Sequence, residues 1–399
     1  MDLSLFLIYA CAISVTSVLV SILRRMKSWK GTTSSKRFPG PTQFPLIGRV
    51  HDLPMTSTWL KFKEWADQYG PIYETSMMGQ KFIVISDEDM ATDLMVKKGN
   101  SFSGRAQIRA LIDHKKGPTY VALQNRNGTH TRTSSRSELT STETWRTQRK
   151  WVHAAMAASS QKHFNGHIDR ELRRYLMTLL VDPAKFHSNT RELTGRIMAR
   201  LAWDDAAQAQ RYGEEATKTL RQMSISGNIV NAVTPLWHIA DFVGYNPWRK
   251  YEAAREGNMT AWWRQSLQVA KKRYTEGTLP SDTWSYRYLE HLDRDNGSLE
   301  QSDEDEHAAA CMLGFQNMVG VITVAGPLQY FLMAMVLHPE WQGRVQKEID
   351  AVCGERMPNI DDYAALPTLR ACIKETLRWR STVPLGEYVH KSTEAPLTK

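Results

Sequence analysis

The sequence predicts a mainly α-helical protein with small β-sheets, preceded by a transmembrane helix at the N-terminus. Apolar residues recur at helical spacing in residues 164–181 and 186–202, and the chain is mostly helical by pattern from about Thr144 to Val336. Only short runs near the N-terminus are rich in β-forming residues. The length of 399 residues, with 42% hydrophobic residues, allows one large domain or two smaller ones.

Residues 1–30 predict a membrane anchor followed by a basic stop. Leu3 to Leu23 is an uncharged run of 21 residues, which is long enough to cross a bilayer as a helix. Four basic residues follow it: Arg24, Arg25, Lys27 and Lys30. By the positive-inside rule, the rest of the chain then faces the cytosol. A cleaved signal peptide is the alternative, but the run is long and no basic residue precedes it.

The next segment predicts a stiff connector that leads into a small α/β region. Residues 31–48 are rich in proline and glycine, which favours a non-helical hinge. Thr58–Tyr69 is expected to form a helix. Ile72–Met77 and Lys81–Ile85 are expected to pair as a hairpin through Gly79 and Gln80.

Residues 125–144 form a polar insertion that predicts a loop. The segment holds one large apolar residue, Leu139, so it cannot bury a core. A natural long loop and an error in the gene structure, such as a translated intron, both explain it.

A long helix is predicted from the acidic cluster at residues 302–306 to about His338. Carboxylates suit a helix N-terminus because they meet the positive end of the helix dipole. A membrane span over Cys311 to Leu337 is the competing interpretation. Four residues in this stretch favour instead the buried central helix of a large helical domain: Gln316, Asn317, Pro327 and Gln329.

Charge and cysteine content exclude several classes of protein. The net charge of +9 favours an anionic membrane or an acidic protein partner over nucleic acid, because no nucleic-acid-binding motif is present. The four cysteines include no C-x-x-C pair, so neither a zinc site nor a disulfide framework is indicated. The chain also lacks Walker, H-E-x-x-H and G-x-S-x-G motifs, which argues against an unrelated membrane-anchored enzyme.

Two pairs of residues have helical spacing that brings their side chains together. Trp145 and Arg149 are four residues apart, and Glu375 and Arg378 are three apart, so each pair shares a helix face. Alone, the first pair also fits an exposed basic helix, and the E-x-x-R pattern is common. Five tryptophans between Trp237 and Trp284 fit core packing, with lining of a substrate channel as the alternative.

Four segments in order resemble the cytochrome P450 family, in particular fungal, microsomal members of secondary metabolism. They are Trp145–Arg149, Val319–Thr323, His338–Gln342 and the Glu375/Arg378 pair. The resemblance implies a haem b cofactor and NADPH-dependent oxidation, with electrons from a membrane-bound NADPH-cytochrome P450 reductase. It also implies a small apolar substrate, such as a terpenoid, polyketide or alkaloid. The expected location is the endoplasmic reticulum membrane, with a single span.

The resemblance assigns roles to individual residues. Trp145 and Arg149 would reach a haem propionate, and Thr323 and Gly320 would belong to the catalytic helix. The family's acidic position is Ile322 here, so proton delivery would run through Thr323, Asn317 or water, or the reaction is atypical or absent. Glu375 and Arg378 would form a structural core pair. We expect that pair in a buried setting, so that Glu375→Ala would abolish stable expression.

The haem-ligand motif of the family, F-x-x-G-x-x-x-C-x-G, is absent from the chain. None of its cysteines fits that motif: Cys11, Cys311, Cys353 and Cys372. We therefore expect residues 49–394 to form an incomplete P450-like domain without its C-terminal haem loop, followed by an atypical tail at 395–399. The chain would have no axial metal ligand. Two functions remain open: a monooxygenase whose sequence is truncated here, and an inactive remnant that binds no haem.

Overall fold

The computed structural model divides the chain into two compact units, Met1–Gly99 and Asn100–Lys399. It describes residues 38–44, 47–54, 57–77, 80–99, 102, 104–105, 149–153, 165–223, 230, 234–382 and 389–390. The predicted anchor, insertion and tail lie outside these residues, as does Trp145. The single domain expected over residues 49–394 stays a prediction.

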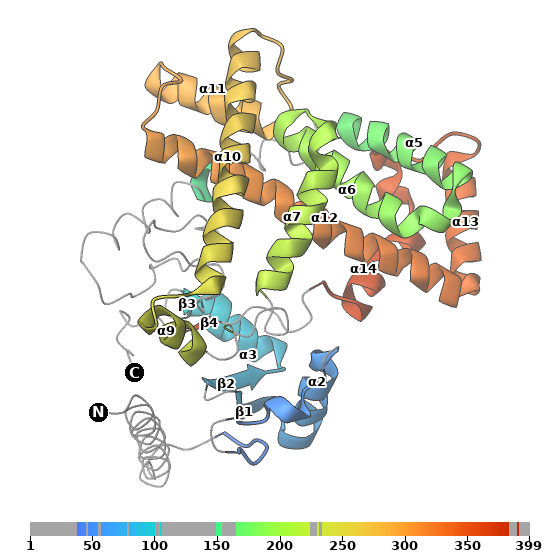
Figure 1. Ribbon diagram of the computed structural model, residues 1–399. Coiled ribbons are helices and arrows are strands. Elements are labelled where there is room, and N and C mark those ends of the chain that lie inside the picture. Colours follow the sequence, from blue (N-terminus) through green and yellow to red (C-terminus); the bar gives the residue numbers. More distant parts are fainter. Residues whose placement is uncertain are drawn as a thin grey trace. The chain divides into compact units, whose positions relative to one another are not determined.

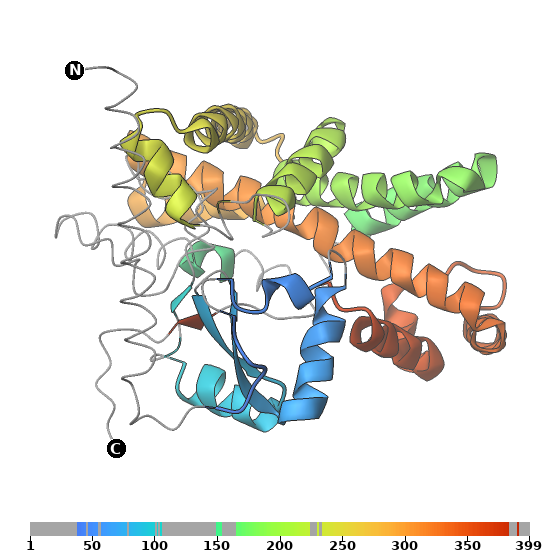
Figure 2. The same ribbon diagram turned by 60° about the horizontal axis from the view of Figure 1, so that its bottom comes forward.

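The first unit contains a β-hairpin flanked by short helices (Figure 2). Its elements in order are η1 (Val50–Asp52), α2 (Thr58–Tyr69), β1 (Ile72–Met77), β2 (Gln80–Ile85), α3 (Glu88–Thr92) and the π-helical turn η2 (Asp93–Lys97). The strands are antiparallel, with Ile72 opposite Ile85 and Met77 opposite Gln80. The predicted helix and hairpin are therefore confirmed, with strand β2 starting one residue earlier than expected.

A small aromatic core holds this unit together. Phe62 and Trp65 of α2 pack with Tyr73 and Met77 of β1, and all four are buried. The Tyr73 hydroxyl donates to the carbonyl of Phe62 at 2.9 Å, so its polar end is satisfied inside the core. Burial raises the pKa of Tyr73.

The described end of the hinge lies along β1. The amide of Glu74 donates to the carbonyl of Pro39 at 2.8 Å, and the amide of Arg49 donates to the carbonyl of Ser76 at 2.7 Å. Gly48 has a positive φ of 62°, and a Cβ there would lie 2.0 Å from the Ser76 carbonyl oxygen. Only glycine fits this close approach. The described residues of this segment are thus non-helical, while the hinge over residues 31–48 stays a prediction.

The second unit is mainly helical (Figure 1). Its helices are α5 (Asn165–Val181), α6 (Phe186–Trp203), α7 (Ala209–Met223), α9 (Thr234–Phe242), α10 (Pro247–Thr275), α11 (Trp284–Asn296), α12 (Asp303–Leu337), α13 (Pro339–Cys353) and α14 (Pro367–Trp379). Short 3₁₀ turns occupy Pro183–Lys185, Ala206–Gln208 and Ile360–Ala365. Strands β3 (Gly104–Arg105) and β4 (Val389–His390) pair antiparallel. The expected fold class, mainly α with small sheets, is confirmed for the described residues.

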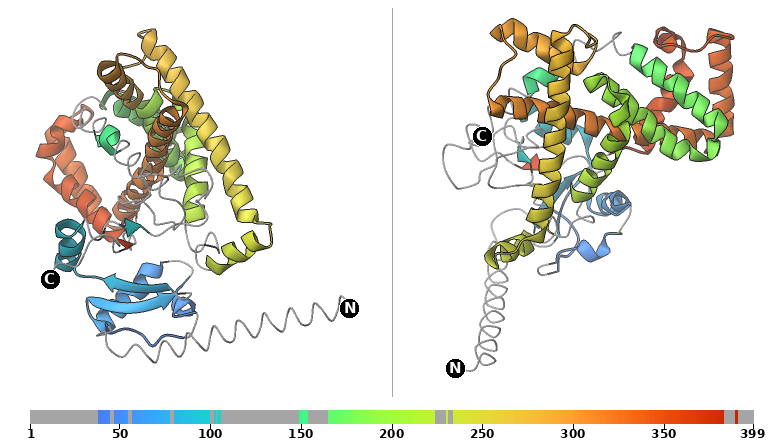
Figure 3. Two further views of the ribbon diagram at one scale, coloured as in Figure 1. Left: turned by 90° about the vertical axis from the view of Figure 1, so that its left-hand side faces the viewer. Right: turned by 45° about the horizontal axis from the view of Figure 1, so that its top comes forward.

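Helix α12 is the centre of this unit, with α6, α7 and α10 packed along it (Figure 3). Ser302 caps its N-terminus by accepting the Asp305 amide at 3.1 Å, which satisfies one of the unpaired donors there. Its first half is buried in the main core, from Ala309 to Met318, together with aromatic residues of α10 and α11.

Helix α12 is also the one helix, within the part of the chain described, whose length and apolar composition would let it cross a membrane. The burial of its first half agrees with the central-helix interpretation. Its second half is more open, since Val336 and Leu337 are exposed. Burial continues beyond Gly320 at Val321 and Ala325, so the central-helix interpretation extends into the second half of α12.

Close contact between α12 and α10 depends on Gly314. A Cβ at this position would lie 2.2 Å from Cδ2 of Trp263, which is fully buried. The indole ring therefore lies directly on the α12 backbone. No larger residue fits without moving the ring or the helix.

We expect Gly314→Ala to destabilise the protein by about 1–3 kcal/mol, because the added methyl group overpacks the contact with Trp263. Urea unfolding followed by far-UV circular dichroism would measure this. Gly343→Ala in α13 is the control, since nothing lies within 4 Å of the Cβ it adds. That change should stabilise by about 0.5–1 kcal/mol through helix propensity. Equal effects of the two substitutions would contradict the contact.

Candidate functional site

The middle of α12 presents an open face that carries Thr323. Val319 and Thr323 are one helical turn apart, and both are exposed. The Thr323 hydroxyl donates to the carbonyl of Val319 at 3.0 Å. Its proton is therefore already used within the helix, while its lone pairs stay available to accept a hydrogen bond from a ligand.

Gly320 lies where α12 approaches α6. A Cβ on Gly320 would lie 2.4 Å from Sδ of Met198, so the glycine leaves room for that side chain. Packing against Met198 therefore explains why position 320 is a glycine. The expected catalytic role of Gly320 stays a prediction.

Ile322, at the position where the family carries an acid, is half-buried and packs against the main core. Its side chain therefore belongs to the packing of the unit, and a carboxylate there would have to be desolvated.

Asn317 is a buried polar residue on the same helix. It is fully buried, and neither its amide nitrogen nor its oxygen makes a well-formed hydrogen bond with the described residues. It lies close enough to the Tyr212 hydroxyl to affect that group. Burial raises the pKa of Tyr212, against the smaller lowering effects of Trp203 and Asn317. A buried polar side chain normally has a hydrogen-bond partner, and Asn317 has no well-formed one among the described residues.

Arg149 and Trp145, the expected propionate-binding pair, are only partly described. Arg149 is exposed, and it belongs to a helical stretch of which residues 149–153 are described. Trp151 in that segment packs edge-to-face against Tyr288 of α11, with the ring centroids 5.0 Å apart. Trp145 lies outside the described residues, so the pairing with Arg149 stays a prediction.

The Glu375/Arg378 pair forms on α14, but in solvent. Nε of Arg378 donates to Oε2 of Glu375 at 2.7 Å, and a second bond joins Nη2 to Oε1. Hydrogen bonding to Arg378 holds the pKa of Glu375 below its usual range. However, the side chains of Glu375 and Arg378 are 61% and 74% exposed. The expected buried setting is therefore wrong for this structure, because no described residue covers the pair.

Helix α14, which carries the pair, is held at its N-terminus by Glu348 of α13. The amides of Thr368 and Leu369 donate to its two carboxylate oxygens at 2.9 and 3.0 Å. Burial alone would raise the pKa of Glu348, but these amides outweigh it and hold the pKa below its usual range. A carboxylate at this end of a helix is also favoured by the dipole.

The described cysteines do not fit the role of an iron ligand. Cys311 is buried with its Sγ 3.6 Å from Nε2 of His307, and the Cys353 thiol donates to Asp362. Burial raises the pKa of Cys353 and of Cys372, which disfavours the thiolate that binds metal. Within the described ranges, no group of three or more His, Cys, Asp and Glu side chains could hold a metal ion.

The second unit is a large helical domain built around one long helix, α12, which carries a threonine on its open face. The sequence model described as "Cytochrome P450" matches residues 38–395. The chain belongs to the cytochrome P450 family.

Three fungal relatives illustrate this kinship. The chain is 28% identical to cytochrome P450 monooxygenase virE of Hypocrea virens, over 87% of this chain and 60% of that protein. It is 30% identical to cytochrome P450 monooxygenase claR of Ampulloclitocybe clavipes, over 89% and 63%. With cytochrome P450 monooxygenase 208 of Postia placenta it shares 26%, over 94% and 69%. The chain thus spans somewhat less than two thirds of the length of virE and of claR.

Sequence reasoning assigned no role to three residues whose contacts the structure reveals. Val319 shares the open face with Thr323, and their spacing of four could have revealed it. Gly314 and Glu348 act through contacts with Trp263 and with the start of α14. No local signal points to these two, because their partners are 51 and 20 residues away in sequence.

We expect Glu375→Ala to lower the melting midpoint by at most about 1 °C, because an exposed ion pair adds little to stability. Glu348→Ala is the comparison, since it leaves the first amides of α14 without their partner. It should lower the midpoint by about 2–4 °C. Differential scanning fluorimetry would measure both. Loss of the folded protein in Glu375→Ala alone would restore the idea of a core lock.

We expect Asn317→Leu to stabilise the chain by about 1 kcal/mol, because it replaces buried polar atoms that make no well-formed hydrogen bond with apolar groups in the same branched shape. Urea unfolding would measure this, with Asn317→Asp as a variant that should destabilise by burying a charge. A clear loss of stability in Asn317→Leu would show that Tyr212 or an internal water satisfies the amide.

Proposed function

We propose that this chain forms the substrate side of a haem-thiolate monooxygenase that oxidises a small apolar metabolite. The observation that carries the proposal is the open face of α12, where Val319 and Thr323 stand exposed beside a packed core. A thiolate-ligated haem supplies oxygen activation when it is bound. The iron ligand would come from outside the described residues.

The open face suits such a substrate in two ways. Val319 offers exposed apolar surface beside Thr323 that a hydrocarbon can cover. Thr323 adds one acceptor that can position a hydroxyl group or water. A face of this kind favours an apolar molecule with few polar atoms over a charged one.

Membership of the cytochrome P450 family also suggests partners for this chain. We propose that electrons come from NADPH through a membrane-bound reductase, and that the N-terminal run places the protein at the endoplasmic reticulum membrane with its main part in the cytosol. The net charge of +9 supports contact with an anionic membrane or an acidic partner. Terpenoid, polyketide or alkaloid scaffolds are the substrate classes expected.

A second candidate function is an inactive remnant that binds no haem. The cysteines favour it, since Cys311 and Cys353 are buried and the pKa of the Cys372 thiol is raised by burial. Partner binding would then be all that the chain retains.

A reduced carbon monoxide difference spectrum on membranes expressing residues 1–399 tests the proposal. We expect no thiolate-type Soret band from this chain, because no described cysteine fits the iron. A longer product that adds an in-frame F-x-x-G-x-x-x-C-x-G segment should give the band. Absence of the band from the longer product, with the protein folded, would overturn the monooxygenase function in favour of the remnant. A band from residues 1–399 would show that one of the four cysteines ligates iron, and serine variants would identify it.

A further inference from the structure

Helix α10 carries a buried ion pair between Glu252 and Arg255. Nε and Nη2 of Arg255 donate to the two carboxylate oxygens of Glu252 at 2.8 and 2.6 Å, and both side chains are buried. Burial raises the pKa of Glu252, and the guanidinium opposes this shift only in part. Because taking two charged groups out of water costs free energy, the pair is weak evidence for stability, and its contacts suggest another role.

The third nitrogen of the guanidinium connects α10 to α7. Nη1 of Arg255 donates to the hydroxyl of Thr219 at 3.0 Å, and it lies 3.9 Å from Oε2 of Glu215 on the same helix. The two bonds to Glu252 hold the planar guanidinium in one orientation, in which Nη1 is directed to α7. Arg255 therefore joins two helices.

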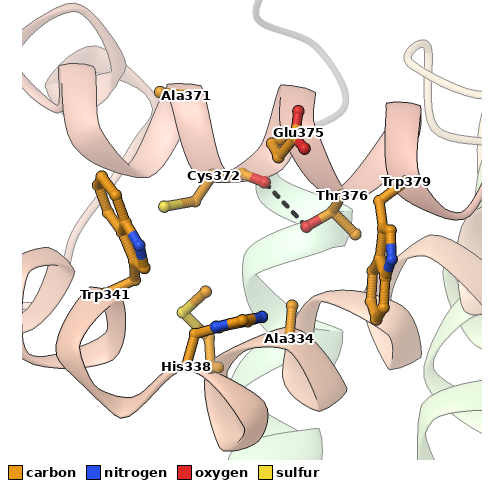
Figure 4. A pocket seen from close by; sticks show the side chains of 9 residues that line it. Ala334, His338, Trp341, Ala371, Cys372, Glu375, Thr376 and Trp379 are labelled. Carbon is orange, nitrogen blue, oxygen red and sulfur yellow. Dashed lines mark hydrogen bonds between the residues drawn. The ribbon is translucent and has the colours of Figure 1, made fainter.

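Thr219 in turn contacts α12. Its hydroxyl donates to Sδ of Met318 at 3.6 Å, and a thioether sulfur is a weak acceptor. Threonines inside helices commonly donate back to a carbonyl one turn earlier, as Thr376 does to Cys372 in Figure 4. The buried hydroxyl of Thr219 links two helices instead. A contiguous series of side chains thus connects α10, α7 and α12.

This contact lies at the end of the buried face of α7. Tyr212, Ala216 and Thr219 are buried and recur at helical spacing, while the next residue, Leu220, is exposed. Tyr212 and Ala216 belong to the main core, where apolar packing holds them. Thr219 therefore ties the C-terminal part of α7 to α12 through a polar contact.

Met318 immediately precedes Val319, the exposed apolar residue of the proposed substrate face. We propose that Arg255 is a positioning residue for this face, because through Thr219 and Met318 it fixes where α7 lies on α12. The inference rests on the proposed function for what the face binds. Its test needs neither haem nor substrate, so the two proposals can fail separately.

The methyl signal of Met318 reports the contact. We would label the methionine methyl groups of the whole chain with carbon-13, record NMR spectra in detergent micelles, and assign Met318 by its loss in Met318→Leu. Thr219→Val removes the hydroxyl and keeps the branched shape, so it should move the signal by more than its line width. Thr219→Ser keeps the hydroxyl and should leave the signal near its original position.

Thr217→Val is the matched control on the same helix. Thr217 is exposed, and its hydroxyl donates within α7 to the carbonyl of Gly213 at 2.9 Å. This change should leave the Met318 signal in place. A signal that does not move in Thr219→Val, or that moves equally in Thr217→Val, would overturn the proposal.

Amide hydrogen exchange tests whether Arg255 acts through Thr219. Glu252→Leu combined with Arg255→Leu replaces the buried ion pair by apolar groups, a change that folded proteins tolerate. This double variant and Thr219→Val should each raise exchange in residues 215–223 about fivefold, measured by peptide mass spectrometry. All three substitutions together should raise it no further, because they remove the same connection.

Two exchange results would contradict this role. Additive effects in the triple variant would show that Arg255 holds α7 independently of Thr219, and unchanged exchange in the double variant would assign the ion pair to α10 alone. Should the double variant not fold, Arg255→Lys decides, since it keeps a charge beside Glu252 but lacks the fork that reaches Thr219. Arg255→Lys should move the Met318 signal as Thr219→Val does, and an unmoved signal would overturn the proposal.

Discussion

The close packing of α12 against its neighbours is the constraint on which the second unit depends. Gly314 lets the Trp263 ring of α10 rest on the helix backbone, and Gly320 does the same for Met198 of α6. The two glycines are six residues apart, which places them about 120° apart around the helix axis. Neighbouring helices therefore contact α12 on two sides. These contacts fix the rotation of α12 about its own axis, and with it the directions of its remaining side chains.

Ion pairs also join neighbouring helices of the second unit. Near the N-terminus of α12, Glu306 binds Lys271 of α10 at 2.6 Å, and Arg264 of α10 pairs with Asp303. Between α5 and α6, the buried Glu171 accepts from both Arg196 and Arg200. Burial alone would raise the pKa of Glu171, but the two guanidinium groups hold it below its usual range. The buried Glu171 pairs add little net stability, because desolvation offsets most of their attraction, and the exposed Arg264–Asp303 pair adds little because solvent screens it.

Local signals allowed much of the fold to be predicted. The helix over Thr58–Tyr69, the hairpin and the start of α12 near Ser302 depend on periodicity, turn residues and capping, which act over a few residues. The order of motifs likewise indicated the family. The setting of Glu375 and Arg378 could not be predicted in this way. Spacing shows that they pair, but their exposure depends on what packs over α14, which is a property of the whole fold.

The arrangement of α12 limits how protons can reach the open face. Asn317 is also six residues from Thr323, so the two side chains differ by about 120° around the axis and about 9 Å along it. Asn317 lies buried beside Tyr212, and Ile322 packs into the core, so neither side chain is placed to contact the Thr323 hydroxyl directly. That hydroxyl donates to Val319 and must break this bond before it can donate outward. The route through Asn317 that the sequence left open would therefore need a further group between the two side chains. In the proposed oxidation, water held by Thr323 is the route that this geometry favours, since the hydroxyl can accept from water without losing its bond to the helix.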